Sequence, residues 1–185
     1  MLRITIETDA ERQQNWQMKS TNLQQTFIDL IETHKGIVYK IVNTYCADIE
    51  DRKDLAQAII LKLWQSFEQF DGRAAYSTWM YRIALNTAIS YYRTEKKRKK
   101  VSSAYTDDFL NIAELSNQSN DSKTKLLHQF ISDLKDLDKA LMLLYLEEKS
   151  HQEIADILGI STSNVATKIG RIKIILKQKF SETNL

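Results

Sequence analysis

The chain has 185 residues, and its 26 Lys and Arg against 24 Asp and Glu leave a formal net charge of only +2. It contains no proline, four glycines and one cysteine, which excludes an intrachain disulfide and a thiolate metal cluster and favours an all-α fold over one built from tight turns. Neither a signal pattern nor an apolar run of membrane-spanning length is present in the sequence, so we expect a cytoplasmic protein without membrane insertion.

The first 20 residues are polar and predict an N-terminal arm, flexible or loosely docked. Residues 3–7 alternate like a short strand, but no nearby segment offers an obvious pairing partner. Helical spacing of apolar residues begins after Thr21 or Asn22, either of which can cap a helix that runs to about Tyr45. Gly36 lies inside this helix and marks a candidate bend.

A second helix is predicted from about Asp51 to Phe67, with acidic residues at its N-terminus that suit the helix dipole. One stripe of it is apolar, and Ile60 and Trp64 widen that stripe beyond what a single buried face needs. Two interpretations stay open. The helix is buried on two sides, or it docks a partner through the surplus apolar surface, with a polar rim of Asp54, Gln57, Lys62 and Gln65.

A loop over residues 68–75, which contains Gly72, leads into a third helix. On this helix the spacing places one aromatic, two cations and an amide on one face, formed by Trp79, Arg82, Asn86, Ser90 and Arg93. The opposite face is mostly apolar, and a dense basic run follows over residues 93–100. Cations hold phosphates and aromatic rings stack on exposed bases, so this stretch suits a nucleic-acid strand. The alternative is a core helix followed by a solvated charge run.

Residues 101–122 are rich in Ser, Asn, Thr and Asp and contain no Lys or Arg. This composition predicts a flexible acidic linker, although its four large apolar residues are compatible with a helical turn. The chain is thus predicted to form two small helical domains, over residues 21–100 and 123–185.

The clearest local pattern is a helix-turn-helix in the second domain. Ser150 and Glu153 have the spacing of a capping box, and Gly159 stands where a left-handed residue ends a helix. Ile154, Ala155 and Leu158 supply the packed side of this first helix, and Ile160 fills the turn.

Ser161 or Thr162 then caps a second helix of this motif. Its inward stripe is apolar, and its outward face carries Asn164, Thr167, Lys168 and Arg171, with Lys173 beyond. These donors suit a DNA major groove, where Arg and Lys read guanine and Asn reads adenine. An ordinary helical hairpin with a solvated polar face is the alternative.

The residues do not indicate an enzyme or a cofactor site. His34, His128 and His151 are scattered along the chain, without evident ligand partners. Neither a nucleophile–base spacing nor a phosphate-binding glycine loop occurs.

Taken together, the two halves resemble a bacterial RNA polymerase sigma factor of the extracytoplasmic-function (ECF) type, over residues 27–100 and 126–180. Residues 54–64 are similar to the family's region 2.2, and residues 78–88 to its regions 2.3 and 2.4. Residues 153–161 and 164–171 are similar to region 4.2.

The resemblance implies that the protein binds core RNA polymerase, mainly through the β′ subunit and also through β, and that it recognises and opens a two-element promoter. The implied polymerase contacts are Asp54, Gln57, Leu63 and Trp64. The residues implied to bind and open the minus-ten element are Arg73, Tyr76, Trp79, Arg82, Asn86, Arg93, Lys96 and Lys97. Those implied to read the minus-thirty-five element are Asn164, Thr167, Lys168, Arg171 and Lys173. An anti-sigma factor is a further expected partner.

Two other functions remain open at this point. One is a sigma-like mimic or adaptor that binds an anti-sigma protein, and the other is a helix-turn-helix regulator that acts without polymerase. The wide apolar second helix argues against the regulator. A mimic does not need the basic run over residues 93–100 or the outward Lys168 and Arg171, which this chain has.

Overall fold

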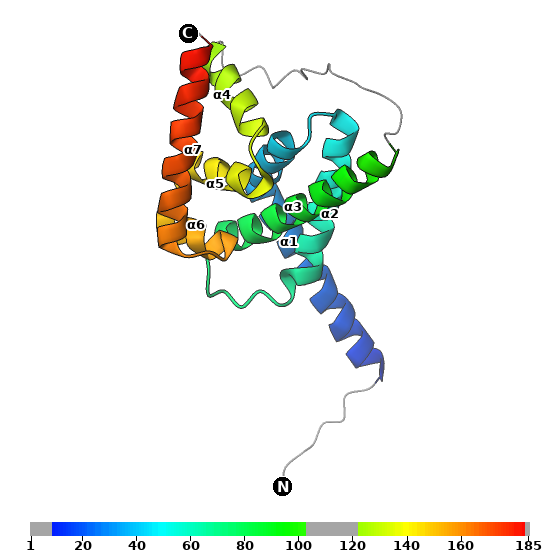
Figure 1. Cartoon of the computed structure of the whole chain (residues 1–185). Coiled ribbons are helices and arrows are strands. Elements are labelled where there is room, and N and C mark those ends of the chain that lie inside the picture. The colour runs from blue at the N-terminus through cyan, green and yellow to red at the C-terminus, as the bar shows by residue number, and fades with distance from the viewer. Residues whose placement is uncertain (1–8, 103–121, 184–185) are drawn as a thin grey trace. The chain divides into compact units, whose positions relative to one another are not determined.

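The computed structural model describes residues 9–102 and 122–183, without the side chains of residues 9–20, 95–102, 122, 123 and 125. Its helices are α1 (Asp9–Tyr45), α2 (Ile49–Phe67), α3 (Tyr76–Ser102), α4 (Ser122–Ser132), α5 (Asp136–Leu146), α6 (His151–Leu158) and α7 (Thr162–Glu182) (Figure 1). The two described ranges contain no strand, and the all-α prediction is confirmed. The alternating residues 3–7 and most of the expected linker, residues 103–121, lie outside those ranges.

The chain divides into two compact units, Met1–Lys35 and Gly36–Leu185. In the first unit Phe27 and Leu30 are buried. The helix α1 begins at Asp9, well before the cap expected at Thr21 or Asn22. The physical reason is that residues 9–20 contain neither proline nor glycine, so nothing in that polar stretch interrupts a helix.

In the second unit, α2 packs on α3. The Asp48 side chain caps α2 by accepting hydrogen bonds from the backbone N–H groups of Glu50 at 2.7 Å and Asp51 at 3.2 Å. The buried stripe of α2 is Leu55, Ile59, Leu63 and Phe67. The side chains buried on α3 are Met80, Tyr81, Ala84, Leu85 and Ala88.

The helices α4 to α6 all contact α7, which runs along them in Figure 1. The stripe of α7 that faces them is Val165, Ile169, Ile172 and Leu176, as the spacing predicts. At the far end, the rings of Phe130 and Phe180 meet edge to face with centroids 5.0 Å apart. These contacts hold the helix-turn-helix as one packed body.

Within the same unit, α3 also packs on α5 and α6. The Tyr45 hydroxyl donates a hydrogen bond to the backbone carbonyl of Asp136 at 2.6 Å, at the start of α5. Beside it, the buried Lys139 ammonium lies 4.9 Å from the Tyr92 ring centroid and 5.8 Å from that of Tyr45. The second unit therefore brings the two predicted sets of functional residues into one packed body.

Candidate nucleic-acid interface

The turn between α6 and α7 is built by the caps that the sequence predicts. Ser150 Oγ accepts a hydrogen bond from the Glu153 backbone N–H at 3.2 Å, and the Glu153 carboxylate accepts one from the Ser150 N–H at 2.9 Å. The hydrogen bond from that backbone N–H is the largest cause that lowers the pKa of Glu153 to about 2, with the Ser150 hydroxyl and Lys149 contributing further. The capping box is thus confirmed, and Glu153 stays ionised in it.

Gly159 ends α6 with φ of 67° and ψ of 35°, in the left-handed region that glycine adopts without strain. The carbonyl of Ala155 accepts hydrogen bonds from the N–H groups of Gly159 and Ile160. Ile157 is buried in the packed side of α6, whereas Leu158 is only half-buried, so the expected role of Leu158 passes to Ile157. The sequence pattern of a helix of eight residues does not fix its buried side to better than one residue, and this explains the difference.

The outward face of α7 carries the predicted donors. Asn164, Thr167 and Arg171 are exposed, and Lys168 is half-buried. Ser161 caps the helix by accepting a hydrogen bond from the Asn164 N–H at 3.3 Å, which places this face directly after the turn. A capped helix that presents donors from its first turns is the geometry by which a helix enters a major groove.

The same face continues into Ile174 and Ile175, which are exposed. Lys173 donates to the Tyr145 hydroxyl, and its ammonium lies 4.1 Å from the centroid of that ring. Lys173 is therefore held against α5, while its side chain stays exposed.

An aromatic cluster lies where the loop after α2 enters α3. The rings of Phe70 and Tyr76 are stacked with centroids 4.5 Å apart, and Phe70 lies 5.2 Å from Trp79. Trp79 in turn lies 6.3 Å from the buried Phe67. Phe70 belongs to the loop that the sequence predicts before this helix, and it joins the expected site residues Tyr76 and Trp79 in one cluster. Phe70 lies two residues before Gly72, whose φ of 73° turns the chain in this loop.

The exposed face of α3 matches its predicted polar face. Arg82, Asn86, Ser90 and Arg93 are exposed, and Trp79 is half-buried above the core. In the loop, Arg73 pairs with Asp71 at 3.0 Å, and both side chains are largely in solvent. Lys96 and Lys97 belong to α3, but their side chains lie outside the described part of the chain.

The wide apolar surface of α2 is partly buried in the fold and partly exposed to solvent. Leu63, one of the expected polymerase contacts, is fully buried, so its side chain is not available to a partner while the helix is folded. Ile60, Leu61 and Trp64 are exposed by 37%, 54% and 39%. Asp54 and Gln57 are exposed on the same helix. An exposed apolar group with polar residues around it is the arrangement typical of a protein–protein interface.

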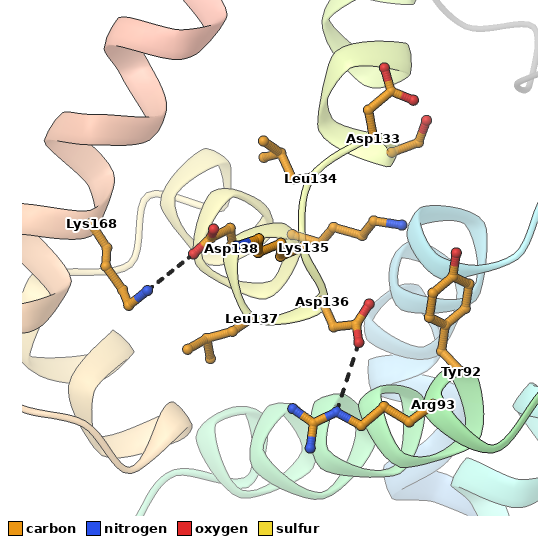
Figure 2. Close-up of a pocket in the computed structure, with 11 residues that line it drawn as sticks. Tyr92, Arg93, Asp133, Leu134, Lys135, Asp136, Leu137, Asp138 and Lys168 are labelled. Atoms are coloured by element: carbon orange, nitrogen blue, oxygen red, sulfur yellow. Dashed lines mark hydrogen bonds and ion pairs between the residues drawn. The ribbon is translucent and has the colours of Figure 1, made fainter. Parts of the chain in front are cut away.

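Several of the predicted nucleic-acid residues meet groups of α5 and α6. The Arg82 guanidinium donates to the carbonyl of Asp156, with Nε at 3.1 Å. Arg93 pairs with Asp136 at 3.8 Å, and Lys168 with Asp138 at 3.4 Å, as Figure 2 shows. The structure thus brings cations of both predicted DNA surfaces next to acceptors of the chain itself.

Two features are absent from the described residues. No group of three or more metal-ligating side chains occurs among them. None of their helices is long and apolar enough to cross a membrane.

Comparison with known proteins places both halves in one family. Residues 30–98 match the family model of sigma-70 region 2, and residues 124–176 match that of sigma-70 region 4. The RNA polymerase sigma factor YlaC of Bacillus subtilis is 30% identical over 139 residues, which cover 73% of this chain and 80% of that protein. The ECF RNA polymerase sigma-E factor of Haemophilus influenzae is 26% identical over 187 residues, which cover 95% of each chain.

A solved structure has the same fold. The sigma factor RpoE of Bartonella quintana, in complex with the anti-sigma factor NepR, superposes with a TM-score of 0.65 at 15% sequence identity. The match covers 86% of this chain and 97% of that one.

Proposed function

The chain belongs to the ECF group of RNA polymerase sigma factors, and from that premise we propose which of its surfaces bind core polymerase and which bind and open the promoter. As a sigma factor, it directs transcription initiation by binding core polymerase and recognising promoter DNA.

The proposal assigns the minus-thirty-five element to the outward face of α7. Lys168 and Arg171 have the donors that pair with guanine edges, and Asn164 has those for adenine. Thr167 and Lys173 flank them and reach methyl groups or phosphates. The observation that carries this assignment is the exposed row of donors directly behind the capped turn at Gly159.

Opening of the minus-ten element is assigned to α3 and the loop before it. Separating bases costs a few kcal/mol for each unstacked step. Aromatic stacking recovers about 1–3 kcal/mol for each base, and the cluster of Phe70, Tyr76 and Trp79 offers rings for it. Arg73, Arg82 and Asn86 supply donors beside these rings, while Arg93, Lys96 and Lys97 continue the positive charge towards phosphates.

Core polymerase is assigned to the exposed face of α2. Ile60, Leu61 and Trp64 form its apolar centre, and Asp54 and Gln57 belong to its rim. By resemblance to the family, this face binds the β′ subunit of the polymerase, and the β subunit is a second contact. An anti-sigma factor is a further proposed partner, supported by the complex in which the Bartonella quintana relative is held. The proposal assigns no catalytic step and no cofactor.

The test of the DNA assignment reverses two charges on α7. We expect Lys168→Glu with Arg171→Glu to abolish promoter-specific binding by the polymerase complex, because both donors to guanine are replaced by acceptors that repel phosphates. Lys35→Glu with Lys53→Glu makes the same change in net charge at exposed positions of α1 and α2 and serves as the control.

Binding is measured at one fixed salt concentration, since phosphate contacts make affinity strongly salt-dependent. Binding of the α7 variant to core polymerase should stay intact. If its promoter affinity equals that of the parent, α7 does not read the minus-thirty-five element.

A further inference from the structure

Two lysines of α7 are held by α5 from different sides of the helix. Lys168 and Lys173 are five positions apart, which is about 140° around a helix axis. Both nevertheless meet α5, which lies against α7 (Figure 1). Lys168 pairs with Asp138 near the start of α5, and Lys173 donates a hydrogen bond to the Tyr145 hydroxyl near its end.

The partners of these two lysines differ in charge. The Asp138 carboxylate neutralises Lys168, whereas the partner of Lys173 is a neutral hydroxyl. The contact with Tyr145 therefore leaves the positive charge of the Lys173 ammonium in place. Lys177 lies one turn further along the same side of α7 and is exposed. This side of the helix thus presents positive charge next to the last turn of α5.

The contact with Tyr145 holds the ammonium without using all of its donors. An ammonium has three N–H donors, and the Tyr145 hydroxyl oxygen accepts a hydrogen bond from Lys173. The ammonium lies 4.1 Å from the centroid of the Tyr145 ring, which attracts it as a cation. Because the hydroxyl oxygen is the acceptor, the hydroxyl hydrogen can be donated to another group. The bond is exposed to solvent, so an acceptor from outside can reach both donors.

An acceptor that takes a hydrogen bond from each of these donors, and that is attracted by the charge, is anionic and has two oxygens close together. A DNA phosphate has both properties. When a helix enters a major groove, its outward face meets base edges and the phosphates lie at its flanks. Lys173 is six residues from Thr167, or about 120° around the axis from the outward face. Its position is therefore that of a phosphate contact and not of a base contact.

We propose that Tyr145 and Lys173 form one phosphate-binding pair beside the minus-thirty-five element. Lys173 supplies the charge, and Tyr145 holds its ammonium and donates a second hydrogen bond to the same phosphate. The DNA-binding surface then extends from the helix-turn-helix onto the last turn of α5. A lysine that is held in advance loses less conformational entropy on binding, so it binds more tightly. The inference rests on the proposed assignment of α7 to promoter DNA.

The experiment maps the contact one phosphate at a time. Core polymerase loaded with the full chain is titrated with a fluorescein-labelled promoter duplex that run-off transcription has identified. In a series of such duplexes, single phosphates around the minus-thirty-five element are replaced by neutral methylphosphonates. Lys173→Gln removes the charge, and Tyr145→Phe removes only the hydroxyl group. Their matched controls are Lys35→Gln and Tyr39→Phe, at exposed positions of α1.

For the parent we expect one phosphate at the flank of the element whose replacement weakens binding roughly tenfold. The same replacement should weaken binding by less than about twofold in Lys173→Gln, and by roughly threefold in Tyr145→Phe, where the lysine remains but is no longer held. Lys173→Gln should also lower the salt slope by about 1, and Tyr145→Phe should leave that slope unchanged. Both control variants should repeat the results of the parent.

The same phosphate dependence in Tyr145→Phe as in the parent would show that the hydroxyl only joins α5 to α7, and this result overturns the pair. A series in which no phosphate depends on Lys173 overturns it as well. Lys168→Glu with Arg171→Glu, measured on the unmodified duplex, separates this inference from the proposed function. If that variant loses binding while either contrary result holds, the pair is wrong and the assignment of α7 stands. If it binds as the parent does, the assignment falls and the pair falls with it.

Discussion

Glu153 illustrates how a single residue holds the recognition motif together. Its carboxylate accepts a hydrogen bond from the Ser150 N–H, which would otherwise be unpaired at the start of α6. The Ser150 hydroxyl oxygen in turn accepts one from the Glu153 N–H. Replacing it with Ala should lower the free energy of unfolding by about 0.5–1 kcal/mol. Gln152→Ala, which removes an exposed side-chain bond to Asp156 on the same helix, is the control and should cost less.

The pH dependence of this effect has a definite sign. The folded pKa of Glu153, about 2, lies below its ordinary value of 4.5, so its stabilising effect is complete above pH 4.5 and is lost as pH falls towards 2. Denaturant unfolding at several pH values should therefore show the gap between parent and Glu153→Ala narrowing over that window. A gap that widens on acidification would contradict the capping assignment.

Two glycines offer the same substitution with opposite expected signs. Gly159 has φ of +67° and Gly170 lies inside the α7 helix, and neither has a neighbouring atom that an added methyl group would meet. Gly159→Ala should destabilise by about 1 kcal/mol, because the left-handed conformation strains Cβ. Gly170→Ala should stabilise by roughly 0.5–1 kcal/mol, because Ala has the higher helix propensity. Thermal unfolding of both variants checks the pair, and a shift of the same sign in both would contradict it.

At the scale of the element, neighbouring residues of α2 are expected to have different roles, one in stability and the other in docking. Leu63 is fully buried and Trp64 is exposed, although the two residues are adjacent. Leu63→Ala should cost about 2–5 kcal/mol of stability through the cavity that it leaves. Trp64→Ala should leave unfolding nearly unchanged and weaken binding to core polymerase, because an exposed aromatic residue in an apolar centre is a typical binding hot spot.

The measurements are denaturant unfolding and titration of labelled core polymerase. Lys53→Ala, exposed near the start of the same helix and outside the proposed docking surface, is the control for binding. Loss of stability in Trp64→Ala without loss of polymerase affinity would show that its ring serves the fold and not the partner.

Helices whose signals are local could be predicted from the sequence, and those whose signals are tertiary could not. Ser150, Glu153 and Gly159 act through bonds within a few residues, so the sequence predicted the caps of α6 correctly. The beginning of α1 was missed because residues 9–20 carry no apolar stripe to mark them as helical. Leu63 was predicted as a contact residue because periodicity alone does not say which side of a wide stripe is buried.

At the scale of the whole molecule, the contacts between α3 and the helix-turn-helix had no signal in the sequence. Lys139 was not singled out, because a lysine is expected in solvent, and here it is 4% exposed beside two tyrosine rings. The pairing of Arg82 and Arg93 with groups more than 40 residues away likewise depends on the packing of α3 against α5 and α6. Sequence patterns identified the candidate DNA residues, and only the structure showed that the chain itself occupies several of them.

As a sigma factor, this protein is expected to give core polymerase its promoter specificity. The direct measurement is run-off transcription by purified core RNA polymerase, with and without the protein, on a library of upstream regions from its own genome. We predict initiation only in its presence, at sites that share a two-part promoter. Polymerase binding without initiation would point to a mimic or adaptor, and binding to neither polymerase nor DNA would contradict the account altogether.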